Sequence, residues 1–284
     1  MACTLVPRMV AVALVVAAAA PLAAQQTAEQ LRAKFTISVP QQQIEMSSQP
    51  FFRGAPGTSS GSPMGFGPNW RDAFVGGGYQ QVRGIRRPDG SVTGGGNSDG
   101  SVSGGFGLGN SHDAIGLEVI VTSLSTFRSG FGNLTAFSFK AHHMVSGSAA
   151  IAVGVENAFV VGGYKTDGTS SVYVVASKVI GLSSSNGYFK ALTVSGGIGN
   201  GRFRFQKDVL IHRKTVNAFG SAGLLIVDQL SAIADWTGQD LTLGASIVPF
   251  KKFPFILTPA LADVTGTASD KMRFIMGAGI GIRF

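Results

Sequence analysis

Apolar side chains alternate with glycine and arginine through residues 273–284, at the end of the chain. Every second position from Phe274 to Phe284 is apolar, and Arg273, Arg283 and three glycines stand between these positions. Side chains point to alternate faces along a strand, so the pattern predicts one continuous apolar face. A terminal aromatic on such a strand is typical of outer-membrane barrels, whose strands need roughly ten residues to cross the hydrocarbon.

The apolar face of this last strand is a candidate assembly signal. The strand must close the barrel against a first strand near residues 71–83, so its outer side chains should matter for insertion. The candidate residues are Phe274, Ile280, Ile282 and Phe284.

Alternation of the same kind recurs along the chain after Trp70 and predicts twelve strands. In one of them Leu117, Val119 and Val121 are apolar, while Gly116 and Glu118 fall between them. The expected spans are 71–83, 101–109, 113–123, 133–143, 148–156, 172–182, 189–199, 216–227, 229–237, 240–248, 253–262 and 273–284.

The connections between these spans are alternately long and short, with Gly238-Gln239 as the exception. Outer-membrane barrels have long extracellular loops and short periplasmic turns. The sequence therefore predicts an all-β fold, an antiparallel transmembrane β-barrel of about twelve strands over residues 71–284.

The first 70 residues have a different character. An apolar run from Met9 to Ala20, followed by small residues up to Ala24, predicts a signal peptide over residues 1–24. The sole cysteine, Cys3, lies within it, so we expect no disulfide or thiol ligand in the mature chain. Residues 25–70 are rich in Pro, Gly and Ser and predict a mostly disordered periplasmic arm or linker.

The composition is apolar overall, yet the apolar residues are spread along the chain at alternating positions and are not gathered into long runs. Charged residues make up only 13% of the chain, glycine numbers 40, and the mean hydropathy is +0.26. No apolar stretch after Ala24 approaches the length of a membrane helix. Without Arg8 the mature chain has 22 basic and 15 acidic residues, a balance of +7 that concerns partners and not the fold.

Charged residues on the polar faces of the strands should line the lumen, because charge is costly on the lipid face. They could form a selectivity lining for solutes, or they could pair across strands and fill a closed barrel. Inward glycines could widen a pore or let the barrel flatten. The candidate lining residues are Glu118, Lys140, Glu156, Lys178, Arg273 and Arg283.

A cluster of basic residues occupies the seventh connection, which we expect to be extracellular. Such a loop would attract the phosphate and uronate groups of lipopolysaccharide or acidic glycan. Ordinary solvated charge is the alternative interpretation. The candidate contact residues are Arg202, Arg204, Lys207, Arg213 and Lys214, with His212 beside them.

Catalytic and metal-binding patterns are weak. The match Gly57-Thr-Ser-Ser-Gly61 to a nucleophile elbow lies in a linker, without the strand and helix that the elbow needs. Asn110-Ser-His-Asp113 falls in an expected turn. His142 and His143 are adjacent on an expected strand and point to opposite faces. We expect no catalytic residue, no metal, no cofactor and no nucleic-acid partner.

Two resemblances accompany these patterns. The segment from Leu230 to about Ala262, with Ala234-Asp-Trp before a Gly turn and then Leu241-Thr-Leu-Gly, is similar to a hairpin of exopolysaccharide-associated outer-membrane barrels. Segments such as Ala114-Ile-Gly-Leu-Glu and Val153-Gly-Val-Glu-Asn resemble uncharacterised secreted proteins of cyanobacteria. Both resemblances imply a barrel and supply no catalytic residue.

The sequence thus favours a non-enzymatic barrel of the outer membrane of a diderm bacterium. It would be a passive, porin-like pore for small solutes with a slight anion preference, or an envelope component near surface glycan. The alternatives are a lipid-modifying outer-membrane enzyme and a soluble secreted β protein. The expected partners are outer-membrane lipid, lipopolysaccharide, the barrel-assembly machinery and acidic polysaccharide.

Overall fold

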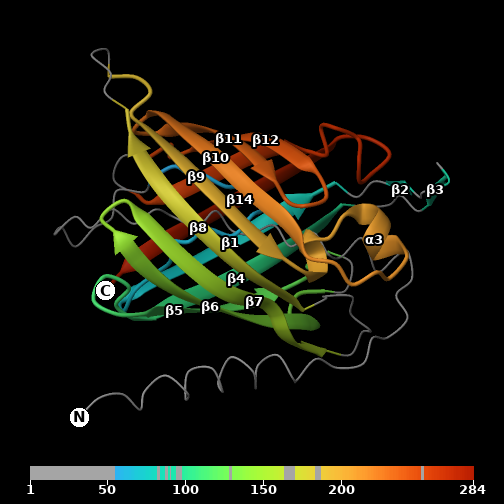
Figure 1. Ribbon diagram of the computed structural model, residues 1–284, viewed down its shortest axis with the longest axis horizontal. Coiled ribbons are helices and arrows are strands. Elements are labelled where there is room, and N and C mark those ends of the chain that lie inside the picture. Colours follow the sequence, from blue (N-terminus) through green and yellow to red (C-terminus); the bar gives the residue numbers. More distant parts are fainter. Residues whose placement is uncertain are drawn as a thin grey trace, which may run out of the picture.

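Twelve antiparallel strands close into a single barrel in the computed structural model (Figure 1). The structure describes residues 55–81, 84–86, 89, 91–93, 98–127, 130–162, 170–182, 187–250 and 253–284. The expected signal peptide and residues 25–54 of the expected arm lie outside this part of the chain. The barrel strands are β1 (Asp72–Gln80), β4 (Asp99–Gly109), β5 (Gly116–Ser123), β6 (Leu134–Ser146), β7 (Ala149–Gly162), β8 (Ser171–Gly181), β9 (Ala191–Gly199), β10 (Asn217–Val227), β11 (Leu230–Trp236), β12 (Leu241–Ile247), β13 (Phe255–Ala262) and β14 (Arg273–Arg283).

Each strand pairs with its neighbours in the chain, and β1 closes the barrel against β14. The closing register runs from Asp72 opposite Arg283 to Gln80 opposite Ile275. The short strands β2 (Ile85–Arg86) and β3 (Val92–Thr93) pair with each other between β1 and β4. The fold class is therefore as predicted, with all twelve expected strands present.

The two faces of the wall differ as the alternation predicts. On β8, Val172 and Val174 are exposed on the outside, while Ser171 and Tyr173 are buried on the inside. Large apolar side chains are exposed around the outside of the wall, where lipid replaces water in a membrane barrel. Closure leaves no unpaired edge, so every wall strand can satisfy its backbone groups in lipid.

The connections fall into two sets, one at each end of the barrel. The terminal rim is the end at which Phe284 lies, and its connections span residues 110–115, 147–148, 182–190, 228–229 and 248–254. The loop rim is the opposite end, with connections spanning residues 81–98, 124–133, 163–170, 200–216, 237–240 and 263–272. Figure 1 shows the C-terminus at one end and the β2–β3 pair with helix α3 (Gln206–Leu210) at the other.

The candidate assembly residues lie on the outer face of β14. Ile282 and Phe284 are exposed at the terminal rim, and the ring of Phe274 lies 6.4 Å from that of Tyr79 on β1. The alternation from Phe274 to Phe284 is thus confirmed, and the role in assembly stays a prediction. None of the helices in the described residues is long and apolar enough to cross a membrane.

Candidate functional site in the barrel lumen

Residues 55–69, here called the plug segment, run through the inside of the barrel. Near the terminal rim the backbone N–H of Gly57 donates to Ser246 Oγ at 2.8 Å, and the Gly57 carbonyl accepts from Ser231 Oγ. At the far end of the segment, Asn69 Oδ1 accepts from the backbone N–H of Ser111, in a turn of the same rim. The plug segment is therefore a loop that enters and leaves through the terminal rim.

The bend of this loop wraps around the carboxylate of Asp235, near the end of β11 at the loop rim. Oδ2 accepts hydrogen bonds from the backbone N–H groups of Ser60, Gly61 and Ser62 at 2.8, 2.9 and 3.1 Å. The Ser59 hydroxyl donates to Oδ2 at 2.7 Å, and the Ser62 hydroxyl donates to Oδ1 at 2.5 Å. Successive N–H groups that converge in this way form an anion-binding concavity, and its anion here is a wall side chain.

The returning part of the plug segment crosses to the opposite wall. The backbone N–H of Gly65 donates to Ser177 Oγ on β8 at 2.7 Å, and the Phe66 carbonyl accepts from Lys140 Nζ on β6 at 2.8 Å. Met64, directly before Gly65, is 1% exposed. Side chains on both walls therefore hold the plug segment mainly through its backbone.

Glycines in the wall make room for this segment. A Cβ built on Gly223 of β10 would lie 2.4 Å from Thr58 Cβ, and one on Gly107 of β4 would lie 2.3 Å from the Pro68 carbonyl oxygen. A Cβ on Gly116 would meet the ring of His142 at 2.4 Å. These inward glycines border an occupied lumen rather than an open one.

The structure differs here from the expectation that the arm extends to residue 70. Of that arm, residues 55–69 lie inside the barrel, because a Gly- and Ser-rich segment supplies backbone donors at close range to wall acceptors. The chance match Gly57–Gly61 to a nucleophile elbow is the first part of this loop.

Five of the six candidate lining residues point inward, and each has a partner of opposite charge. Lys140 Nζ lies 2.5 Å from Glu118 Oε2, and both side chains are at most 2% exposed. Arg202 bonds both carboxylate oxygens of Glu156. The remaining pairs are Arg273 with Asp240 at 2.5 Å and Arg283 with Asp72 at 2.7 Å.

The sixth candidate, Lys178, does not line the lumen, and the expectation for this residue was wrong. It is exposed on the outer face of β8, in line with Val172 and Val174, close to the terminal rim. The inner face of β8 carries no charge and mixes Ser171 and Ser177 with Tyr173 and Val175, so the one charge on the strand is a misleading marker of the lumen side. A lysine near a rim can extend its ammonium group toward the membrane interface.

This correction also removes the basis for a slight anion preference. That expectation counted Lys140, Lys178 and Arg283 against Glu118 and Glu156. Lys178 leaves the lumen, and the buried inward carboxylates of Asp72, Asp99, Asp235 and Asp240 join it. Among the described residues, inward acids therefore outnumber inward bases.

Two of the five candidate glycan contacts belong to the interior instead. Arg202 lies between Glu156, the Gly61 carbonyl at 2.8 Å and the ring of Phe203, whose centroid is 4.3 Å from Cζ. Burial by itself lowers the pKa of Arg202, but the surrounding groups, Glu156 foremost and then Asp235 and Tyr173, act in the opposite direction and the net effect is a raised pKa. Arg204 is buried and donates to the carbonyls of Gly201 and Arg213.

The connection that carries these arginines folds inward at the loop rim. Phe203, in the short 3-10 helix η1 (Gly201–Phe203), is fully buried and stacks on Phe219 with centroids 4.3 Å apart. It also contacts the ring of Tyr173 in an edge-on arrangement, with centroids 5.9 Å apart. Only Lys207, Arg213 and Lys214 of the candidate contacts are exposed, with His212 beside them.

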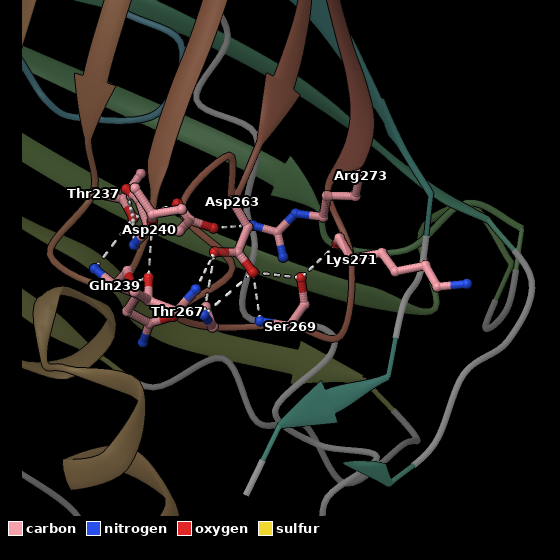
Figure 2. Close-up of polar contacts among 10 residues, drawn as sticks. Thr237, Gln239, Asp240, Asp263, Thr267, Ser269, Lys271 and Arg273 are labelled. Carbon is pink, nitrogen blue, oxygen red and sulfur yellow. Dashed lines mark hydrogen bonds and ion pairs between the residues drawn. The ribbon is translucent and has the colours of Figure 1, made fainter. Parts of the chain in front are cut away.

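A second polar cluster stiffens the loop rim beside the plug segment (Figure 2). The carboxylate of Asp263 accepts hydrogen bonds from the backbone N–H groups of Thr267 and Ser269. The carboxylate of Asp240 forms an ion pair with Arg273. Burial raises the pKa of Asp240, while Arg273 and Thr237 act in the opposite direction. No group of three or more metal-ligating side chains occurs in the described residues.

Sequence reasoning missed Asp235 and the plug segment. Asp235 ends an alternating strand next to Trp236, and its parity with Ser231 and Ile233 does place it on the buried face. The plug segment has no periodicity, and nothing in its composition distinguishes it from a linker.

No family model matches this sequence, and no curated protein sequence matches it. Among solved structures, the COG4313 outer membrane channel of Pseudomonas putida F1 is similar with a TM-score of 0.44 and 10% identity, over 76% of this chain and 96% of that one. Omp33, an outer membrane protein of Acinetobacter baumannii, gives 0.39 and 9% over 75% and 98%. Ail, the attachment invasion locus protein of Yersinia pestis, gives 0.21 and 12% over 75% and 98%. The assignment of this chain as an outer-membrane type of β-barrel rests on its own strand pairing and alternation.

Proposed function

We propose that this protein is a non-enzymatic barrel of the bacterial outer membrane, with a pore that its own plug segment closes. The pore opens when the plug segment withdraws through the terminal rim, which faces the periplasm. The observation that carries the proposal is the path of residues 55–69. Because Gly57 and Asn69 both lie near the same rim, the loop can leave without threading the chain through the barrel.

The contacts of the plug segment suit reversible withdrawal. The segment contains no charged residue, and it is held largely by hydrogen bonds to serine, aspartate and lysine side chains of the wall. Each bond to a serine contributes about 0.5–1.5 kcal/mol net and each bond to the charged Asp235 or Lys140 about 1.5–3 kcal/mol, because water replaces these bonds when the groups separate. The wall side chains that bond it include Ser177, Ser231, Ser246 and Asp235, which water can solvate once the segment leaves.

Crowding the plug segment should open the pore. Valine at position 223 would place its Cβ within 2.4 Å of Thr58 while leaving the outer face unchanged, so Gly223→Val should displace the loop. We expect the wild-type protein to be nearly silent in planar bilayers and the variant to conduct. Gly196→Val is the matched control, since Gly196 is exposed on the outer face of β9 and no atom lies within 4 Å of its added Cβ.

Heat-modifiable gel migration in the same samples reports whether each barrel is folded. A folded Gly223→Val barrel that stays silent, or a wild-type barrel that conducts steadily, contradicts the proposed gating. Conductance in Gly196→Val equal to that of Gly223→Val would also contradict it, because that change does not touch the plug segment.

A second role is favoured by the exposed surface of the 200–216 connection. Lys207, Arg213 and Lys214 stand there beside the exposed apolar side chains of Phe205 and Ile211. Phosphates attract the cations, and acyl chains accommodate the apolar groups, so we propose that this surface rests on lipopolysaccharide. The triple variant Lys207→Glu, Arg213→Glu, Lys214→Glu should bind lipopolysaccharide vesicles several-fold more weakly at low salt. Unchanged binding in a vesicle sedimentation assay would remove this role.

A further inference from the structure

One inward carboxylate, that of Asp235, takes all of its described hydrogen-bond donors from the plug segment. All hydrogen bonds to Asp235 among the described residues come from Ser59, Ser60, Gly61 and Ser62. Its side chain is fully buried, and in the part of the chain that the structure describes no lysine or arginine forms an ion pair with it. Withdrawal of the loop strips these donors from a carboxylate on the wall.

The other inward carboxylates have ion-pair or hydrogen-bond partners outside the plug segment, and these partners remain when the loop leaves. Glu118 keeps Lys140, Asp240 keeps Arg273, and Asp72 keeps Arg283. Asp99 keeps its bonds from the backbone of Gly100 and from the hydroxyl of Ser125. These three close ion pairs have almost no net charge and contribute little to the field along the lumen. Asp99 and Asp235 form no ion pair among the described residues, and of the two only Asp235 loses its hydrogen-bond donors when the loop leaves.

Arg202 is a candidate to neutralise Asp235, since the two charges interact electrostatically. Its guanidinium is occupied, however, by both oxygens of Glu156 and by the ring of Phe203. Releasing it toward Asp235 would leave Glu156 buried without its partner, which costs several kcal/mol. The exchange therefore only moves the excess negative charge from one wall residue to another.

We infer that Asp235 becomes a cation-binding site when the plug segment withdraws, and that it makes the opened lumen prefer small cations to anions. The inference rests on the proposed gating and reverses the anion preference expected from sequence. A carboxylate on a low-dielectric wall attracts cations strongly, as in the charged rings that select ions in channels. The ligand class is a small monovalent cation, with potassium as the probe.

Reversal potentials across a potassium chloride gradient test the inference in the opened barrel. Gly223→Val should show a several-fold preference for potassium over chloride, and Gly223→Val with Asp235→Asn should lose most of it. Gly223→Val with Asp228→Asn is the matched control. That change removes the same charge from an exposed turn at the terminal rim, so the preference should persist.

A substitution in the plug segment itself is a second, independent way to open the pore and test the cation preference. Thr58→Phe enlarges the plug segment at the same contact and leaves every wall residue in place, so it should give the same cation preference. Conducting barrels that prefer chloride, or that keep their potassium preference without Asp235, overturn the inference and leave the gating intact. Silent but folded Gly223→Val and Thr58→Phe barrels overturn both.

Discussion

Ion pairs inside the barrel place full charges where water is scarce, and their stability depends on mutual neutralisation. Lys140 and Glu118 are the most deeply buried of these pairs, with side chains 2% and 0% exposed. Lys140 also donates to the Phe66 carbonyl, so it couples the wall to the plug segment. Burying two charges is itself costly, and removing one partner from such a pair is far more damaging than removing both.

Glu118→Gln should therefore destabilise the barrel by about 3–5 kcal/mol, because the Lys140 ammonium loses its carboxylate. The free energy of unfolding, measured by urea titration of the refolded protein in lipid vesicles, checks this expectation. The double variant Glu118→Gln, Lys140→Met should recover most of the loss, since it leaves no buried charge at the site. A single variant within 1 kcal/mol of wild type would show that water reaches this pair.

At the scale of elements, the wall was predictable from sequence and the contents of the lumen were not. Most of the strands alternate with a period of two, although 216–227 alternates poorly, and this pattern together with the long and short connections was enough to locate all twelve strands. The one charge on β8 does not mark the lumen side, because Lys178 lies on the outer face while the inner face mixes Tyr173 and Val175 with two serines. The plug segment leaves no periodic trace, since it is bound through backbone groups to single side chains such as Asp235 and Ser177.

Arg202 illustrates the same limit in a connection. Its position among basic residues predicted a surface role, while its guanidinium bonds Glu156 on β7, 46 residues away in sequence. Pairing over such a separation depends on how the 200–216 connection folds over the rim. No local pattern in the sequence contains that information.

For the whole molecule, the two rims must face different compartments, and this decides the side from which the lumen is closed. Lys207 at the loop rim and Asp228 at the terminal rim are both exposed, so either position accepts a labelled cysteine. The sole native cysteine, Cys3, lies in the expected signal peptide, so each variant would carry a single thiol after cleavage. On intact cells a membrane-impermeant maleimide should label Lys207→Cys and leave Asp228→Cys unlabelled, because long loops of such barrels face outward. Permeabilised cells should label both, which controls for accessibility. If Asp228→Cys alone were labelled on intact cells, the terminal rim would face outward and the orientation of the barrel would be the reverse of the one expected. Since Gly57 and Asn69 both lie near the terminal rim, the plug segment would then withdraw toward the outside.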